Sequence, residues 1–280
     1  MKNSTVQKIA VVTGAGGTLC SEMAKDLAKQ GYKVALLGRS LDKLKIVEEE
    51  IKSMGQVAIS VSTDVSDEAS VINAHAIILK ELGSCTVLIN GAGGNQMEAL
   101  TNITEFDDRE LDGDEAIKGF FNLNMDVFKS VINVNTMGTV IPSFVFGKDM
   151  AKQKHGSIIN IASMNSFRPL SKVGAYGMAK AGIANFTQWL AAYLAPAGVR
   201  VNAIAPGFFL NDRSIKIMFD ENGNKTDRAI NVLGHTPMNR FGEAKELIGC
   251  MNWLIDENTA GFVTGIVVPI DGGFLASSGV

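Results

Sequence analysis

The stretch KIAVVTGAGGTLCSEMAKDLAKQ, residues 8–30, decides the fold. Its first apolar run, residues 8–13, predicts a short buried strand, the four residues GAGG at 14–17 predict a turn, and residues 18–30 have the pattern of a helix. A strand, a glycine turn and a helix in this order are the setting in which free N–H groups at a helix N-terminus hold a phosphate. A plain turn between a strand and a helix is the alternative interpretation, because glycine-rich turns are common.

The same alternation continues along the chain. Apolar runs predict further strands at residues 32–37, 57–61, 85–89, 157–162, 199–205 and 266–270, and amphipathic segments predict helices at 41–54, 67–82, 127–153, 175–195 and 243–256. This pattern indicates an α/β fold with one doubly wound, Rossmann-type parallel sheet of about seven strands and helices on both faces. In such sheets, ligands bind beyond the carboxyl ends of the strands, where the strand order reverses.

We expect one domain over residues 1–280, because the sequence contains no internal repeat and no interdomain linker. Two segments interrupt the pattern. Residues 95–125 are acidic and predict a surface insertion with a short helix or two, which we interpret as a solvated flap without chemistry. Residues 208–235 are polar and irregular, and their length favours a substrate lid over a simple connection.

Composition excludes several classes of protein. Hydrophobic residues make up 46% and charged residues 20%, which is typical of a globular domain, and a net charge of −3 without a basic block argues against a nucleic-acid partner. No apolar stretch is long enough to span a membrane, and the first one enters a glycine turn, unlike a signal peptide. The three cysteines match no metal or redox spacing and fit a reducing compartment, so we expect a cytoplasmic protein without a bound metal.

A candidate catalytic group lies in the segment SMNSFRPLSKVGAYGMAK, residues 163–180. Tyr176 and Lys180 are four positions apart, so on a helix they share one face. An ammonium beside a phenol lowers the phenol's pKa and makes it a general acid and base near neutral pH. Ser163 can hydrogen-bond the same substrate oxygen, which suits the interconversion of a carbonyl and an alcohol. Taken alone, the pair is weak evidence and is better interpreted as a surface tyrosine and lysine.

Taken together, these motifs resemble the short-chain dehydrogenase/reductase family over nearly the whole chain outside residues 95–125. The resemblance rests on signatures in the family's order, namely TGAGG at 13–17, Asp64-Val65, NGAG at 90–93, Asn135, Ser163, Tyr176-x-x-x-Lys180, Pro206-Gly207, and VTG at 263–265 before DGG at 271–273. It implies a single Rossmann-type domain, a nicotinamide dinucleotide cofactor and a homotetramer.

The resemblance also implies roles for individual residues. Tyr176 would be the acid/base, Lys180 would lower its pKa and bind the nicotinamide ribose, Ser163 would orient the carbonyl, and Asn135 would hold a water that passes protons to Lys180. The implied cofactor-binding residues are Gly14, Gly16, Gly17, Thr18, Leu19, Arg39, Ser40, Asp64, Val65, Asn90, Gly91, Ala92, Gly93, Tyr176, Lys180, Pro206 and Gly207. Asp64 and Val65 would line the adenine pocket, Asn90 and Gly93 the adenosine side, and Pro206 and Gly207 the nicotinamide side.

The sequence departs from the family pattern at two places. Thr18 and Cys20 occupy the second and third glycine positions of the family's TGxxxGxG loop, and Gly91 replaces the second asparagine of NNAG. Cys20 is small enough to allow close packing between helix and strand, and the Thr18 hydroxyl could cap the helix or meet a phosphate. The first departure alters the loop that would hold the pyrophosphate, whereas Gly91 only loses a side chain, and we still expect cofactor binding.

The end of the second predicted strand favours NADP(H) over NAD(H). A preference for NAD(H) usually needs a carboxylate there to hold the ribose 2′-OH, and Gly38 occupies that position. Arg39 can pair with a 2′-phosphate, and Ser40 can add a hydrogen bond. Arg39 could instead stack on the adenine or pair with a helix carboxylate.

A closer resemblance is to the short-chain-type D-mannonate oxidoreductases, also called fructuronate reductases, in residues 13–28, in GGN at 93–95 with the insertion that follows, and in residues 225–243. It implies a keto sugar acid substrate, for which Asn95, Asn165, Arg168 and Arg228 are the candidate contacts. The alternatives are another sugar or gluconate dehydrogenase, a 3-oxoacyl reductase, or a dinucleotide-sensing regulator without activity. A silent relative should have lost part of the set Asn135, Ser163, Tyr176 and Lys180, which this chain keeps.

Overall fold

The computed structural model describes residues 8–277, apart from the side chains of residues 212 and 213, and it contains one seven-stranded sheet in the order β3-β2-β1-β4-β5-β6-β7. Every neighbouring pair of strands is parallel. The strands are β1 (Ile9–Thr13), β2 (Lys33–Gly38), β3 (Ala58–Ser62), β4 (Val87–Asn90), β5 (Gly156–Ile161), β6 (Val199–Pro206) and β7 (Val267–Ile270). The predicted doubly wound parallel sheet is therefore confirmed.

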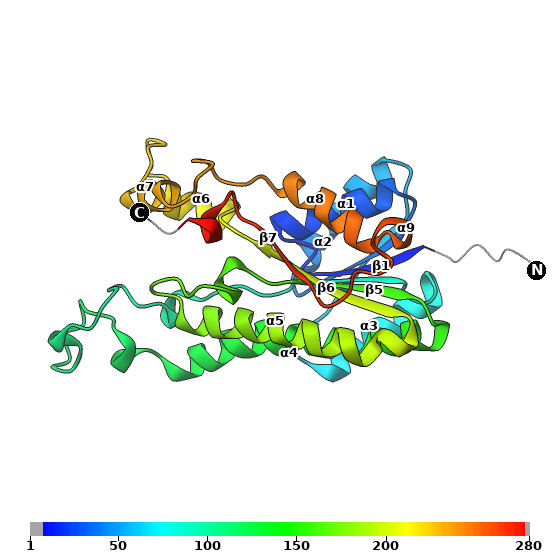
Figure 1. Ribbon diagram of the computed structural model, residues 1–280, viewed down its shortest axis with the longest axis horizontal. Coiled ribbons are helices and arrows are strands. Elements are labelled where there is room, and N and C mark those ends of the chain that lie inside the picture. Colours follow the sequence, from blue (N-terminus) through cyan, green and yellow to red (C-terminus); the bar gives the residue numbers. More distant parts are fainter. Residues whose placement is uncertain (1–7, 278–280) are drawn as a thin grey trace, which may run out of the picture.

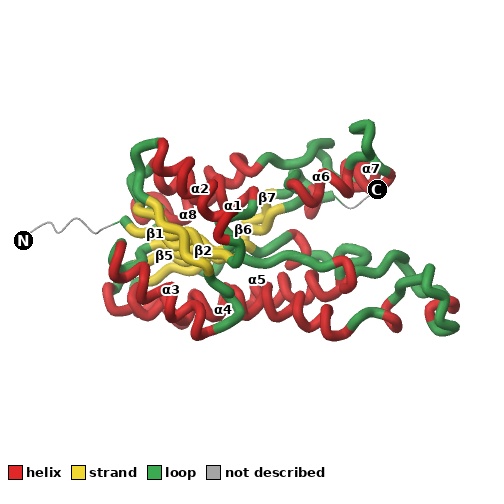
Figure 2. Tube along the Cα trace, turned by 180° about the vertical axis from the view of Figure 1, so that it is seen from behind, coloured by secondary structure: helices red, strands yellow, loops and turns green. Residues whose placement is uncertain are grey.

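Helices cover both faces of this sheet, which lies as a layer between them (Figures 1 and 2). On one face lie α1 (Thr18–Lys29), α2 (Leu41–Ser53), η6 (Ala244–Leu247), α8 (Ile248–Ile255) and α9 (Glu257–Ala260); on the other lie α3 (Glu68–Glu81), α4 (Met125–Gln153), α5 (Gly174–Leu194) and η5 (Ala195–Ala197). The segment predicted as a single helix at 243–256 is thus a tight turn followed by a shorter helix.

The alternation of side chains along the strands produces two cores. In β1, Ala10 and Val12 pack with α1, α2 and α8, whereas Ile9 and Val11 pack with α3, α4 and α5. All four side chains are fully buried, as expected for a parallel strand covered on both faces. The two cores fix the sheet between its helix layers and place the carboxyl ends of the strands at a common edge.

The strand order reverses between β1 and β4, because the chain runs from β1 outward to β3 and then returns to β4. The glycine turn after β1 and the NGAGG turn after β4 therefore lie next to each other. They are joined directly, since the Thr13 hydroxyl oxygen accepts hydrogen bonds from the backbone N–H groups of Gly91 and Ala92, at 3.0 and 3.1 Å. A crevice at such a reversal is where open α/β sheets bind their ligands.

The insertion extends beyond the end of α4 and α5 (Figure 1) and contains three single-turn helices, η1 (Met97–Ala99), η2 (Asp108–Glu110) and η3 (Phe120–Asn122). It is tied to the segment before α5, because Lys172 donates from Nζ to the carbonyl of Asn102 and accepts from the backbone N–H of Thr101. Ala99 packs in a small cluster with Ala175 and Tyr176. This base of the insertion is therefore part of the wall around the candidate catalytic helix.

The segment predicted as an irregular lid is more ordered than the sequence suggested. It contains α6 (Asp212–Met218) and α7 (Asp227–Gly234), and the backbone between them is closed by a turn at Asp220. Buried Met218, Ala229 and Val232 form a separate apolar cluster with Phe208, Phe219 and Phe241. The sequence did not predict this cluster, because the segment is polar overall and its apolar residues are distributed over two short helices.

The predicted domain covers residues 1–280, and its first seven and last three residues lie outside the described part. Within residues 8–277, no helix is long and apolar enough to cross a membrane.

Candidate active site

The glycine turn has the close backbone approach that a ligand cradle needs. Gly14 has a φ of +68°, and a Cβ there would lie 2.9 Å from the backbone of Ala92. A Cβ on Gly16 would lie 2.9 Å from the Cβ of Lys43, so a side chain would also crowd this position. The N-cap of α1 is Gly17, and no side chain caps this helix. The suggestion that the Thr18 hydroxyl caps α1 is therefore wrong, and Thr18 is exposed at the first position of the helix together with half-buried Leu19.

The NGAGG turn is held from both sides. Asn90 is buried, and its Nδ2 donates to Ser143 Oγ and to Asn160 Oδ1, both at 2.9 Å, so its side chain faces the core beneath the turn. At most the backbone of Asn90 can border a ligand in this arrangement. A Cβ on Gly93 would overlap the Asn135 side chain and would lie 3.8 Å from Lys180 Nζ. Gly93 thus brings the turn close to two of the candidate catalytic residues.

The ends of β2 and β3 place Arg39 and Asp64 near each other. Arg39 and Ser40 are exposed, and Ser40 is the N-cap of α2 without a side-chain bond. The Asp64 carboxylate accepts from the Ser66 hydroxyl at 2.6 Å and from its backbone N–H at 2.9 Å. These bonds, with the charge of Arg39 as a smaller cause, hold the pKa of Asp64 below its ordinary value. Val65 is buried against Gly138 of α4, so its side chain could contribute only to the apolar wall of a binding pocket.

Ser163 and Tyr176 are brought together as the sequence suggested. Ser163 follows β5, where its Oγ accepts from the backbone N–H of Asn165 at 3.2 Å. Burial raises the pKa of Tyr176 above its ordinary value, and a hydrogen bond from the Ser163 side chain opposes that rise. The phenol is therefore protonated at neutral pH and is held beside a hydroxyl, which is the arrangement of a proton donor.

Lys180 lies on the same face of α5 as Tyr176, and its Nζ is 5.5 Å from the centre of the tyrosine ring. The ammonium donates to the carbonyl oxygen of Ile161 at 2.7 Å. Burial lowers the pKa of Lys180 to about 8. Burial and the Ser163 side chain are the causes of the shift in the pKa of Tyr176, and the expectation that Lys180 lowers this pKa stays a prediction.

Asn135 makes hydrogen bonds that the sequence did not predict, and its implied role of holding a water stays a prediction. It is buried in α4, where its Nδ2 donates to the carbonyls of Gly94 and Val131 at 2.7 and 2.8 Å, and its Oδ1 accepts from the N–H of Gly94 at 3.1 Å. Both amide hydrogens are therefore used within the protein. The side chain fixes the NGAGG turn, and a bound water would have to contact another part of this residue.

The four candidate substrate residues are in dissimilar places. Asn165 is buried, and its Oδ1 accepts from the N–H of Leu170 at 3.0 Å, which shapes the loop before α5. Asn95 directly follows the NGAGG turn, with its Oδ1 accepting from the N–H of Gln96. Arg168 is exposed and donates to the carbonyl of Ser277 at 3.0 Å, which ties it to the C-terminal segment. Arg228 is exposed on α7.

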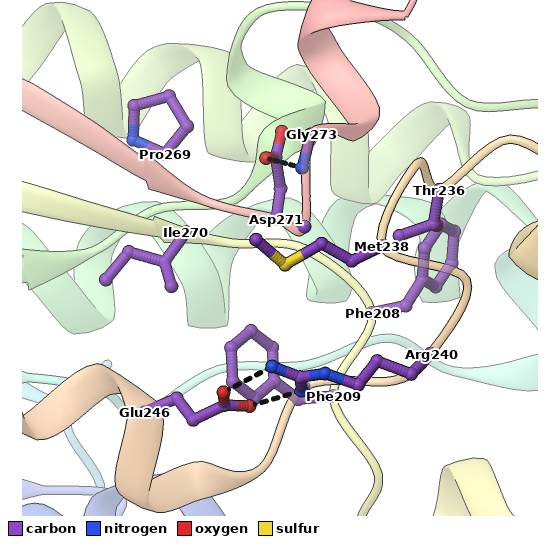
Figure 3. Close-up of a pocket in the computed structure, with 12 residues that line it drawn as sticks. Phe208, Phe209, Thr236, Met238, Arg240, Glu246, Pro269, Ile270, Asp271 and Gly273 are labelled. Atoms are coloured by element: carbon purple, nitrogen blue, oxygen red, sulfur yellow. Dashed lines mark hydrogen bonds and ion pairs between the residues drawn. The ribbon is translucent and has the colours of Figure 1, made fainter.

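At the end of β6, Pro206 and Gly207 meet the chain that follows β7. The N–H of Gly207 donates to Ile270 at 2.9 Å, and a Cβ on Gly207 would lie 2.6 Å from the Cα of Asp271. Asp271 also lines a cavity of about 390 Å³, whose other lining residues include Phe208 and Ile270 (Figure 3). Arg240 and Glu246 both line this cavity and form an ion pair with each other. The sequence motif identified Gly207 as a candidate site residue, but no sequence pattern predicted the cavity.

Comparison with known proteins decides the family. A short chain dehydrogenase family model matches residues 8–221. The chain belongs to the short-chain dehydrogenase/reductase family. The resemblance inferred from the motifs is therefore confirmed, and the protein is an oxidoreductase of this family. Within the described residues, no group of three or more histidine, cysteine, aspartate or glutamate side chains could hold a metal ion.

Particular relatives cover nearly the full length. An "uncharacterized oxidoreductase" of Haemophilus influenzae is 45% identical over 98% of this chain and 95% of its own. A 2-dehydro-3-deoxy-D-gluconate 5-dehydrogenase of Formosa agariphila is 32% identical over 97% of this chain and 94% of its own. A Haemophilus influenza protein, named provisionally as a D-mannonate oxidoreductase and solved with bound NAD, is 44% identical with a TM-score of 0.93, over 99% of this chain and 98% of that one.

Proposed function

We propose that this short-chain dehydrogenase/reductase interconverts a keto sugar acid and its hydroxy acid, D-fructuronate and D-mannonate, with a nicotinamide dinucleotide as the redox partner. The observation that carries the proposal is the placement of the Ser163 hydroxyl and the protonated Tyr176 phenol beside the crevice where the strand order reverses. The sugar-acid substrate is supported by the solved relative of 44% identity and by the gluconate-type relative of 32% identity.

The residues at the crevice fit a dinucleotide. Gly14 approaches the NGAGG turn so closely that a Cβ would collide with backbone, and α1 starts at Gly17 without a side-chain cap. The first N–H groups of that helix are therefore free of side-chain partners, and a helix N-terminus attracts a pyrophosphate. Asp64 and Val65 would border the adenine, and Pro206 and Gly207 the nicotinamide. When bound, the cofactor accepts or supplies the hydride at the reacting carbon.

The protein's own residues handle the proton. In reduction, Tyr176 would donate its phenolic proton to the oxygen of the C5 carbonyl as that oxygen gains negative charge. Ser163, which already bonds the phenol, would donate to the same oxygen and hold it in position. Lys180, four positions after Tyr176 on α5, would help to return a proton to the phenol of Tyr176. In oxidation the same groups act in reverse.

We also propose that the 2′-phosphate cofactor is preferred and that the protein is a homotetramer. The first proposal rests on Gly38, which leaves no carboxylate at the end of β2, and on exposed Arg39; the relative solved with NAD and the proximity of Asp64 to Arg39 weigh against it. The second rests on an apolar face of α4 and α5, where Phe144, Trp189 and Tyr193 are more than half exposed.

The substrate proposal is tested by following cofactor oxidation with a panel of ketones. The panel contains fructuronate, other keto sugar acids, a 3-oxoacyl ester and a hydrophobic cyclic ketone, each with NADH and with NADPH. We expect the highest kcat/KM with fructuronate. Efficient reduction of hydrophobic ketones together with no reaction of keto sugar acids would refute the proposal.

A further inference from the structure

The two places where the sequence departs from its family's pattern are in contact in the structure. Cys20 lies in the first turn of α1, is 4% exposed, and directs its sulfur toward the NGAGG turn. A Cβ added to Gly91 would overlap Cys20 Sγ, and its next neighbours would be the carbonyl oxygen of Thr13 at 3.1 Å and Ile161 Cγ1 at 3.5 Å. The sulfur therefore fills the volume in which a side chain at position 91 would begin.

This contact lies where the two halves of the crevice are joined. The backbone N–H groups of Gly91 and Ala92 are held by Thr13, and Gly14 touches the backbone of Ala92. An added side chain at position 91 would have to displace Cys20 or push the NGAGG turn away from the glycine turn. Because Thr13 and Gly14 belong to the glycine turn, such a shift would change the width of the crevice.

The Cys20 sulfur also lies near Lys180, the residue proposed to help restore the proton of Tyr176. The ammonium of Lys180 is close enough to Cys20 for each to influence the pKa of the other, and Lys180 donates to Ile161, which also neighbours position 91. Burial raises the pKa of the Cys20 thiol to about 12, so the thiol is uncharged at neutral pH. Cys20 is thus a neutral packing group beneath the crevice and beside Lys180.

We propose that Cys20 and Gly91 are a matched pair of positioning residues that sets the spacing between the glycine turn and the NGAGG turn, and thereby the affinity for the dinucleotide. The inference rests on the proposed function, because it assumes that this crevice holds the cofactor. Neither residue has to touch the reacting atoms. The pair acts through the backbone of Gly14 and of the NGAGG turn.

The test is a double-mutant cycle with Gly91→Ala, Cys20→Ala and the two combined. Each variant is titrated with NADH and NADPH by fluorescence, and its Tm is measured in parallel. Gly91→Ala should weaken cofactor binding by about tenfold or more, because overpacking at this contact forces the turn outward. Cys20→Ala should weaken it by about threefold at most. The double variant should bind within about threefold of Cys20→Ala, because the Cys20 sulfur that obstructs a methyl group at position 91 is gone.

Matched controls come from α8. Gly249→Ala is the same substitution at an exposed glycine with open space around its Cβ, and Cys250→Ala removes a half-buried thiol on α8. Both should bind the cofactors as the wild type does. If Gly91→Ala does not fold, the comparison with the double variant still decides, since the double variant should fold and bind.

Three outcomes separate the claims. Wild-type affinity in Gly91→Ala, or a double variant as impaired as Gly91→Ala, would overturn the matched pair. A loss of Tm in Gly91→Ala with unchanged cofactor affinity would assign the contact to stability alone and would overturn it as well. Failure of the wild type to bind either cofactor would instead refute the proposed function.

Discussion

The ammonium of Lys180 donates a hydrogen bond to the carbonyl oxygen of Ile161 at 2.7 Å, at the end of the strand that delivers Ser163. This bond holds the charge beneath the crevice while Tyr176, one turn earlier on α5, faces Ser163. Lys180 is 5% exposed, and its burial is the reason why its pKa is lowered. The lysine is therefore a group whose charge changes near pH 8, below the ordinary range of a lysine.

The first prediction is a pH dependence that follows from this burial. The pKa of Lys180 falls from 10.5 to about 8, so the group is charged below that pH and neutral above it. Reduction consumes a proton, so kcat/KM for reduction should fall as the pH rises through about 8, whereas kcat/KM for oxidation should rise. Initial rates in both directions across a pH series measure this. Lys180→Arg keeps its charge in this range, and an unchanged alkaline limb in that variant would assign the titration to another group.

The second prediction concerns the proton donor. Tyr176→Phe keeps the ring in its apolar cluster and removes only the hydroxyl that bonds Ser163. We expect kcat to fall by about 100- to 10,000-fold, the range typical of a lost general acid. Cofactor affinity and Tm should stay near wild type, and Tyr193→Phe, on an exposed part of α5, serves as the control. Turnover near the wild-type rate would remove Tyr176 from the mechanism.

The sequence predicted the position of each motif because strand ends are set by local patterns. The positions of the strands and of the loops that carry Gly14, Asp64, Asn90 and Ser163 follow from apolar runs and glycine turns, and these were right to within a few residues. What the sequence could not provide was the choice of partner for each side chain. That choice depends on contacts between residues far apart in the chain.

Lys180 and Asn135 illustrate this limit. The spacing of four between Tyr176 and Lys180 places both on one face of α5, as predicted. The hydrogen bond from the Lys180 ammonium to the carbonyl of Ile161, on another element, could not be predicted from that spacing. The Asn135 side chain likewise donates a hydrogen bond to Gly94, which lies 41 positions earlier. The contact between Cys20 and Gly91 joins two departures that looked independent in sequence. Periodicity and spacing report local geometry, and these three relationships are tertiary.

The third prediction concerns Arg39 and the choice of cofactor. If Arg39 pairs with the 2′-phosphate, Arg39→Ala should reduce the preference for NADPH over NADH by about tenfold, as expected for a charge-assisted contact. Lys29→Ala removes an exposed charge at the other end of α1 and should leave the preference unchanged. Fluorescence titration of both cofactors measures the effect. Tighter binding of NADH by the wild type, or an unchanged preference in Arg39→Ala, would refute the preference for NADP(H).

The fourth prediction concerns assembly through the exposed face of α4 and α5. Phe186, Trp189 and Tyr193 stack in succession along α5, with ring centres 5.9 and 5.4 Å apart, and Phe144 lies beside them across an apolar groove of about 540 Å³. Trp189 is 57% exposed, so Trp189→Glu should leave the subunit folded while placing a charge in the middle of the contact. We expect light scattering to show a smaller assembly than that of the wild type.

The matched control for this experiment is Ile46→Glu, because Ile46 is 58% exposed and belongs to α2, on the opposite side of the sheet. Both substitutions add one negative charge at an exposed apolar position, so only the location differs. Ile46→Glu should keep the wild-type assembly. If Trp189→Glu keeps it too, the aromatic face does not join subunits, and a monomeric wild type would exclude the tetramer altogether.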